Sequence, residues 1–136
     1  MKIRFFEKDG QINLDAILYA GIYQFKIGVL GDSEDRYLPL YIGQSASMVR
    51  RGSEHLRELI QNPFYWGLTK ENLENEKLEL VADIYKVVPD KKSLRKEERS
   101  AIKKTRPLSQ NENNDKLNDD RFKVVQTAIE ELLSDR

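Results

Sequence analysis

The chain has 136 residues, of which 39% are hydrophobic and 34% charged, a length and composition that suit one globular domain with its own core. Its formal net charge is zero, which argues against nucleic-acid binding through bulk positive charge, and the lack of cysteine excludes disulfides and thiolate metal sites. Neither a signal peptide nor a run of about eighteen apolar residues is visible, so we expect a cytoplasmic protein with no membrane association.

Three segments in the first half of the chain have the composition of β-strands. The aromatic and β-branched residues of 18–30 and 36–43, separated by the turn residues of 31–35, predict a β-hairpin. Pro39 cannot donate a ladder hydrogen bond, which indicates an edge or a bulge in the second strand. Residues 2–6 are a further, shorter candidate strand.

A helix follows the hairpin. Ser45 or Ser47 can cap it, and it is expected to run to about Ile60, before Asn62 and Pro63 end it.

The second half of the chain predicts one more strand and two helices. After a connection of unassigned structure, 62–75, the strand is expected at 77–88. A basic helix then stops before Pro107. A polar link, 111–119, leads to a last amphipathic helix whose apolar residues are expected to pack on the body: Phe122, Val125, Ile129, Leu132 and Leu133. The order strand, strand, helix, strand, helix, helix predicts a mixed α+β (α/β) fold in a single domain, 1–136.

Positive charge is concentrated in residues 91–106, which contain eight Lys or Arg residues. Such a helix can follow phosphates, with Lys103, Lys104 and Arg106 as candidate DNA contacts, but a solvated helix face explains the pattern equally well.

Helical geometry separates the two adjacent arginines of the first helix. At about 100° per residue, Val49, Leu56, Leu59 and Ile60 form the stripe that is expected to be buried. On the same count, Arg51 and the only histidine, His55, lie beside one another just off its edge, whereas Arg50 points to solvent. Only Arg51 can therefore share a cleft with His55.

In the basic helix, Glu98 falls in the middle of the stripe formed by Leu94, Ala101, Ile102 and Thr105. A carboxylate on a core-facing stripe is costly unless it has a cation or hydrogen-bonding partners. Its neighbour Glu97 falls outside the stripe.

Tyrosines occupy both strands of the predicted hairpin. Strand alternation places Tyr23 on one face with Tyr19 and Phe25, and Tyr41 on one face with Tyr37. By this pattern alone these tyrosines are core residues.

Together these residues resemble the GIY-YIG endonuclease family. The resemblance rests on five elements that occur in the same order as in the family. They are Gly21-Ile22-Tyr23, Tyr41-Ile42-Gly43, Arg51, His55, and Glu98 at the start of the segment 98–107. It covers 19–111 as the nuclease core and leaves 112–136 as linker and C-terminal helix. The resemblance implies a small three-stranded antiparallel sheet flanked by helices.

The resemblance also implies DNA phosphodiester cleavage with one divalent cation, Mg²⁺ or Mn²⁺. Glu98 would be the metal ligand and Arg51 the cation facing the scissile phosphate, while Tyr23, Tyr41 and His55 would surround the attacking water. Which of these three is the general base stays open. The family's closing Asn, usually three residues after the Pro, is displaced here: Gln110 holds that spacing and Asn111 follows it.

Two functions are therefore considered, a leading one and an alternative. The first is a metal-dependent DNA endonuclease, and the alternative is a catalytically silent module that binds nucleic acid or protein on the same scaffold. Substrate preference, a homodimeric state and a targeting protein partner stay open.

Overall fold

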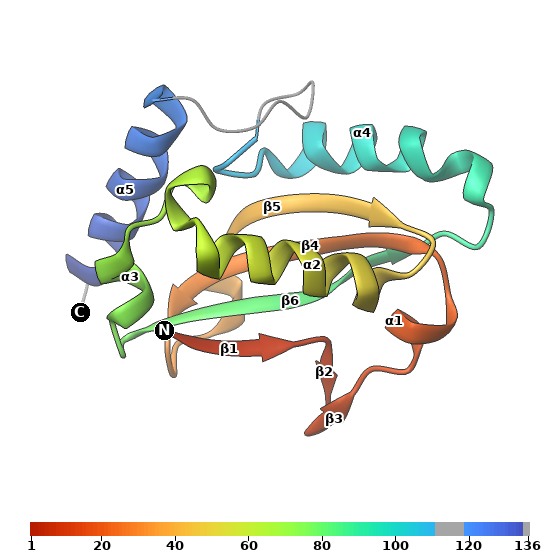
Figure 1. Cartoon of the computed structure of the whole chain (residues 1–136), viewed down its shortest axis with the longest axis horizontal. Coiled ribbons are helices and arrows are strands. Elements are labelled where there is room, and N and C mark those ends of the chain that lie inside the picture. The colour runs from red at the N-terminus through yellow and green to blue at the C-terminus, as the bar shows by residue number, and fades with distance from the viewer. Residues whose placement is uncertain (111–118, 135–136) are drawn as a thin grey trace.

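The computed structural model describes residues 1–110 and 119–134 and has a mixed α+β fold. At its centre lies a four-stranded sheet with the strand order β1-β6-β4-β5 (Figure 1). Its strands are β1 (Lys2–Phe5), β4 (Gly21–Val29), β5 (Leu38–Ser45) and β6 (Leu78–Val87). The α+β class is as predicted.

The sheet differs from the expected three-stranded antiparallel arrangement. The three expected strands are present, with β4 antiparallel to both β5 and β6, but β1 adds a fourth strand parallel to β6. Ile3 and Phe5 of β1 pack against the main core, and β1 closes an edge of β6 that three strands would leave open. Because β1 pairs Lys2 with Glu79, far along the chain, no local pattern indicates this partner.

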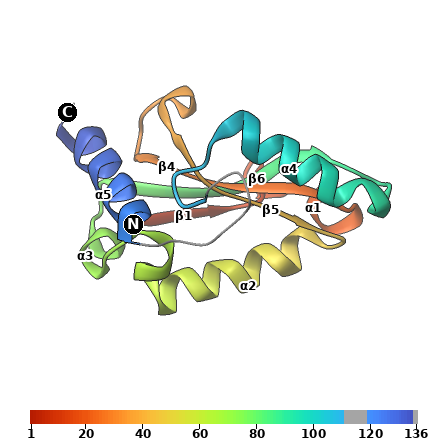
Figure 2. The same cartoon turned by 90° about the horizontal axis from the view of Figure 1, so that it is seen from above.

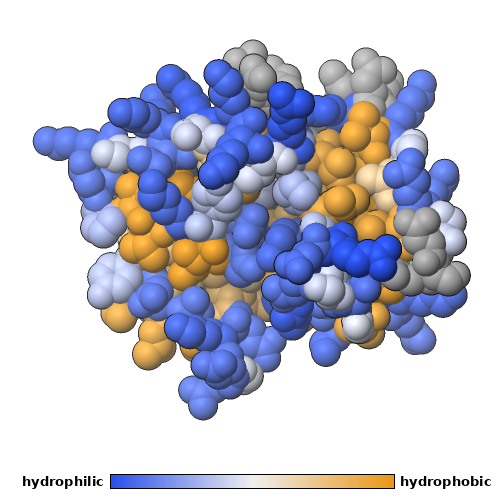
Figure 3. Space-filling model, turned by 180° about the vertical axis from the view of Figure 1, so that it is seen from behind, coloured by the Kyte–Doolittle hydropathy of each residue, from blue (hydrophilic) through white to orange (hydrophobic). Residues whose placement is uncertain are grey.

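A small hairpin and a short helix connect β1 to β4. They consist of β2 (Glu7–Lys8), β3 (Gln11–Ile12) and α1 (Asp15–Leu18). The expected strand at 18–30 therefore begins later, at Gly21. Asp9 and Gly10 both have positive φ, as a two-residue hairpin turn requires. Hydrophobic side chains gather at the end of the molecule that carries α1 (Figure 3), where five are well exposed: Ile12, Leu14, Ile17, Leu18 and Tyr19.

Two helices cover opposite faces of the sheet (Figure 2): α2 (Met48–Gln61) and α4 (Leu94–Thr105). Along β4, Tyr23 points into the main core beneath α2, and Ile22 points into a smaller core beneath α4. Strand β5 lies at the edge of the sheet, and both α2 and α4 contact it (Figure 1).

A bulge changes which face Tyr37 occupies. The pairing register of β4 and β5 shifts between two successive pairs, Phe25 with Tyr41 and Lys26 with Pro39. The expected irregularity near Pro39 is therefore confirmed. Tyr37 consequently packs over Gly28 on the face opposite to Tyr41, and the expectation that these two tyrosines share a face is wrong.

The connection between α2 and β6 folds into two short elements, η2 (Pro63–Trp66) and α3 (Lys70–Glu74). Thr69 and Asn72 form a capping box at the start of α3. Two 3-10 turns, η1 (Glu34–Arg36) and η3 (Lys91–Ser93), precede β5 and α4.

The C-terminal helix α5 (Asp119–Ser134) packs on the body, as predicted. Val125 and Ile129 are buried in the main core, and Leu132 and Leu133 are partly buried against it. Gly67 has a φ of 80°, and a side chain there would collide with Val125. None of the helices within 1–110 and 119–134 is long and apolar enough to cross a membrane.

Candidate active site

The predicted buried stripe of α2 is confirmed in part: Leu59 is buried, and Val49 and Leu56 are partly buried against the main core. The buried residues of the helix are Met48, Gly52, His55 and Leu59, so the helix is turned by about 70° relative to the expected stripe. Ile60, expected in the core, is 49% exposed, and His55, expected at the edge of the stripe, is only 3% exposed. The cause is aromatic packing, because His55 lies among the rings of Tyr23, Tyr41 and Trp66.

Tyr23 and His55 form a buried hydrogen-bonded pair. The Tyr23 hydroxyl lies 2.6 Å from His55 Nδ1. Burial raises the pKa of Tyr23, which keeps the phenol protonated and suits it as the donor to Nδ1. The pair fixes the orientation of the imidazole ring beneath Tyr41.

The glycine of Tyr41-Ile42-Gly43 makes room for this pair. A Cβ at Gly43 would come within 2.5 Å of the Tyr23 ring and hydroxyl. Any larger residue at this position would have to push Tyr23 away from His55. The two tripeptides singled out in the sequence are therefore in direct contact.

Tyr41 lies between the Tyr23–His55 pair and the surface. Its ring packs edge-on against His55, with centroids 5.0 Å apart, and against Trp66, with centroids 4.6 Å apart. Trp66 was not among the predicted site residues, because it lies in a connection without periodicity. The run of three aromatic residues at 64–66 was the one signal that could have indicated a buried anchor there.

The two adjacent arginines differ as expected in exposure. The Arg50 side chain is 83% exposed and the Arg51 side chain 50% exposed. Arg51 donates to Glu54 at 2.7 Å, and its positive charge lowers the pKa values of both Tyr23 and Tyr41. Arg51 is therefore the arginine within electrostatic reach of the tyrosines.

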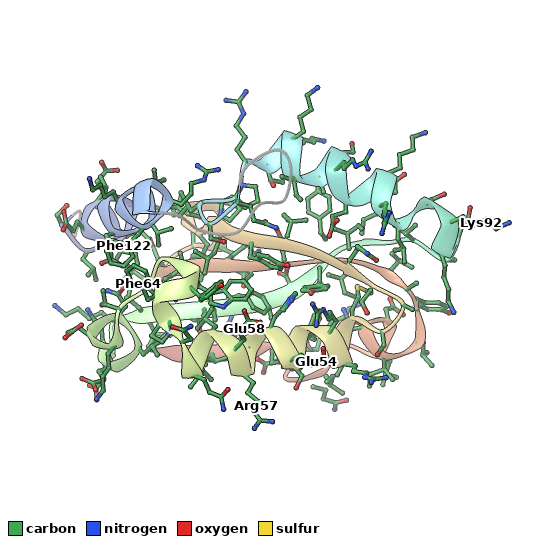
Figure 4. The ribbon with its side chains drawn as sticks, turned by 45° about the horizontal axis from the view of Figure 1, so that its top comes forward. Glu54, Arg57, Glu58, Phe64, Lys92 and Phe122 are labelled. Atoms are coloured by element: carbon green, nitrogen blue, oxygen red, sulfur yellow. The ribbon has the colours of Figure 1, made fainter. Side chains whose placement is uncertain are left out.

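Acidic residues approach Tyr41 from both helices. Glu98 of α4 and Glu58 of α2 both raise the pKa of Tyr41. In Figure 4, Glu58 lies on the side of α2 nearer to β5, whereas Arg57 points away from the sheet. The pKa of Tyr41 is therefore influenced by a cation and a carboxylate of α2 and by a carboxylate of α4.

Glu98 is half-buried on the inner side of α4. Its pKa is raised because burial removes water from the carboxylate, and Arg95 and Arg99 partly oppose this effect. Glu97, one residue earlier, instead accepts a hydrogen bond from Lys86 at 2.8 Å. The two neighbouring carboxylates therefore have different surroundings, as their helical positions indicated.

Glu98 is the single carboxylate that the resemblance names as the ligand of a divalent cation. Within 1–110 and 119–134 no group of three or more His, Asp and Glu residues could enclose a metal. Mg²⁺ commonly binds through one or two carboxylates and keeps its remaining positions for water and phosphate oxygens. A single partly desolvated carboxylate fits that pattern.

At both tyrosines, burial raises the pKa by more than Arg51 lowers it. Burial is the largest influence on each, and the pKa values of Tyr23 and Tyr41 lie above the ordinary range for a phenol. A tyrosine base would therefore need more positive charge than Arg51 supplies. Tyr23 has no exposed surface, whereas Tyr41 is 7% exposed, so Tyr41 is the phenol nearer to solvent.

The basic end of α4 is exposed. Lys103, Lys104 and Arg106 all lie at the surface, and Arg106 ends the helix with a positive φ of 51°. At the other end, Lys92 projects into solvent (Figure 4).

Gln110 pairs with the outer edge of β5. It is buried, its Oε1 accepts from Ile42 N at 2.7 Å, and its Nε2 donates to Ile42 O at 2.8 Å. Ile42 is the central residue of the second tripeptide, so Gln110 holds the backbone that carries Tyr41. Asn111, the other candidate for the family's closing amide, lies outside the described residues.

Comparison of the chain with protein-family models, with curated proteins and with solved structures gave no match. The functional interpretation rests on the motifs and on the geometry described above.

Proposed function

We propose that this chain is a metal-dependent DNA endonuclease of the GIY-YIG type. The observation that carries the proposal is the set of groups around Tyr41: the Tyr23–His55 pair beneath it, Arg51 from one helix and Glu98 from the other. Phosphodiester cleavage needs a positioned water, positive charge on the non-bridging oxygens and a cation ligand, and this set contains a residue for each task.

Each residue has a distinct role in this proposal. Arg51 contacts a non-bridging oxygen of the scissile phosphate, which requires the phosphate to displace Glu54. Tyr41 and His55 orient the attacking water and are the candidates for its base, while Tyr23 positions His55. A Mg²⁺ or Mn²⁺ ion bound at Glu98 would supply the charge that stabilises the developing negative charge on the phosphate.

A catalytically silent binding module is the second candidate. The observation that favours it is the burial of both tyrosines, whose raised pKa values oppose proton abstraction. On this interpretation the same surface holds DNA or a protein without turnover.

Plasmid nicking with and without Mg²⁺, at matched protein concentration, tests the proposal. We expect nicking only with Mg²⁺ or Mn²⁺, and Glu98→Gln should abolish it while leaving DNA binding intact or stronger, since a negative charge facing the phosphate is lost. Millimolar Mg²⁺ should raise the thermal midpoint of the wild type but not that of Glu98→Gln.

Glu97→Gln is the matched control, because it makes the same substitution at a carboxylate that bonds to Lys86. It should remain active. DNA binding without Mg²⁺-dependent nicking, or full activity of Glu98→Gln, would favour the binding module.

A further inference from the structure

One aromatic side chain beside the candidate site is unusually accessible. Tyr65 of η2 is 50% exposed, although the next residue, Trp66, is buried against Tyr41 and His55. The turn is therefore anchored on one side and displays Tyr65 on the other.

Tyr65 is continuous with the candidate site. A small hollow at the surface is lined by Tyr41, Tyr65, Trp66 and Ser109. The half-exposed phenol thus borders the same hollow as the tyrosine that would lie next to the scissile phosphate.

The neighbouring aromatic of η2 has a structural partner. Phe64 is 55% exposed but packs against Phe122 of α5, with ring centroids 4.8 Å apart (Figure 4). Phe64 thus helps to hold α5, and Tyr65 borders the hollow beside Tyr41.

Cationic side chains line a second and larger hollow next to Gln110. Arg106 and Arg121 lie there beside Gln110 and four apolar residues, Ile102, Pro107, Leu108 and Val124. An aromatic face combined with nearby cations is typical of surfaces that bind unpaired nucleic acid, because bases stack on the ring and phosphates approach the cations. An apolar peptide would not require these arginines.

We infer that Tyr65 stacks on an unpaired nucleobase adjacent to the cleaved phosphodiester, so that the preferred substrate is DNA with an unpaired nucleotide at that place. The inference rests on the proposed endonuclease function. In a duplex both faces of a base are covered by its neighbours, whereas an unpaired base leaves the stack at low cost and offers a face to Tyr65.

A binding experiment without Mg²⁺ tests the contact independently of cleavage. The probes are two DNA duplexes of one sequence, one fully paired and one with a single unpaired 2-aminopurine. For the wild type we expect tighter binding of the second probe and quenching of the 2-aminopurine. Tyr65→Ala should lose both effects, with affinity for that probe falling about tenfold and affinity for the paired duplex unchanged. Tyr65→Phe should retain them.

Tyr19→Ala is the matched control, since Tyr19 is 45% exposed but lies at the end of α1, in another part of the molecule. It should behave as the wild type. Unquenched 2-aminopurine, or equal affinity of Tyr65→Ala and wild type for the unpaired probe, would overturn the inference.

The cleavage arm separates this inference from the proposed function. With Mg²⁺, the ratio of kcat/KM for the unpaired over the paired substrate should fall about tenfold in Tyr65→Ala. Equal cleavage of both substrates by the wild type overturns the inference and leaves the endonuclease standing. Quenching that depends on Tyr65, without cleavage of any DNA, supports the stacking contact and overturns the endonuclease.

Discussion

Two buried tyrosines, one on each face of the sheet, bond to titratable side chains in different surroundings. On the face covered by α2, the Tyr23 hydroxyl lies 2.6 Å from His55 Nδ1. On the opposite face, the Tyr37 hydroxyl donates to Glu79 at 2.7 Å. Burial is the main cause of the raised pKa in both tyrosines, and it raises the pKa of Tyr37 to about 12.

The difference lies in how the charges around each pair are matched. Glu79 also accepts from Arg4 at 2.9 Å, and Arg4 bonds to Glu34, so this network pairs its charges within itself. Around Tyr23 and Tyr41, Arg51 and Glu98 come from opposite faces and act on the phenols with opposite sign. Arg51 also pairs with Glu54 at 2.7 Å, and in the proposed endonuclease a phosphate displaces that carboxylate, whereas nothing in the proposal requires the bonds of Arg4 to break.

After the complete loss expected for Glu98→Gln, the largest expected effect is at Arg51. Arg51→Ala should reduce nicking by about 100-fold or more, because it removes positive charge from the transition state. Arg50→Ala should reduce it less than threefold, since that side chain is 83% exposed on the outer face. Plasmid nicking rates of the two variants measure this, and equal losses would mean that the inner position of Arg51 does not matter.

The comparison of the two tyrosine pairs can be tested directly. Tyr23→Phe leaves His55 Nδ1 without this bond and should slow nicking at least tenfold, whereas Tyr37→Phe should leave nicking unchanged. Each should cost about 1–3 kcal/mol of unfolding free energy, because each removes a hydrogen bond from a buried titratable side chain. Denaturant unfolding and nicking rates distinguish the two. Loss of activity in Tyr37→Phe would break the comparison.

Alkaline pH should also separate wild type from Tyr37→Phe. A phenol whose pKa is raised on folding binds its proton more tightly in the folded state, so stability falls as pH rises above the unfolded pKa of 10.0. For Tyr37 the loss occurs between pH 10 and about 12. The free energy of unfolding should therefore decline less steeply in Tyr37→Phe over this range, and parallel curves would contradict the assignment.

The smallest expected effect is at the basic end of α4. Replacing Lys103 and Lys104 by Gln should weaken DNA binding a few-fold at moderate salt and flatten the slope of log affinity against log salt, because fewer counterions are released. Fluorescence anisotropy at several salt concentrations measures the slope. An unchanged slope would identify this face as solvated surface only.

Local patterns predicted the elements well and their relative placement less well. The strands carrying Tyr23 and Tyr41 and the helix carrying Glu98 could be located because period and turn residues are local signals. The parallel pairing of β1 with β6 could not, since it joins Lys2 to Glu79 without any local requirement. The inequivalence of Arg50 and Arg51 followed from helical spacing alone.

Errors in the candidate site arose where a polar residue is buried or an irregular segment supplies the contact. His55 counted as polar and was placed at the rim of α2, but a ring of aromatic side chains and a bond to Tyr23 accommodate it in the core. Trp66 and Gln110 lie in segments without periodicity, so no periodic pattern indicated that Trp66 would pack on Tyr41 or that Gln110 would bond to Ile42.

The pairing of residues 108–110 with β5 affects how the chain can associate. Leu108 N donates to Pro39 O, Ser109 donates to Leu40 O, and Gln110 bonds to both backbone groups of Ile42. Exposed strand edges are the usual starting points for intermolecular β-pairing. The native protein therefore offers no template for strand addition along this stretch of β5. We therefore expect that a chain in which this segment has not docked on β5 is more prone to aggregation than the folded protein.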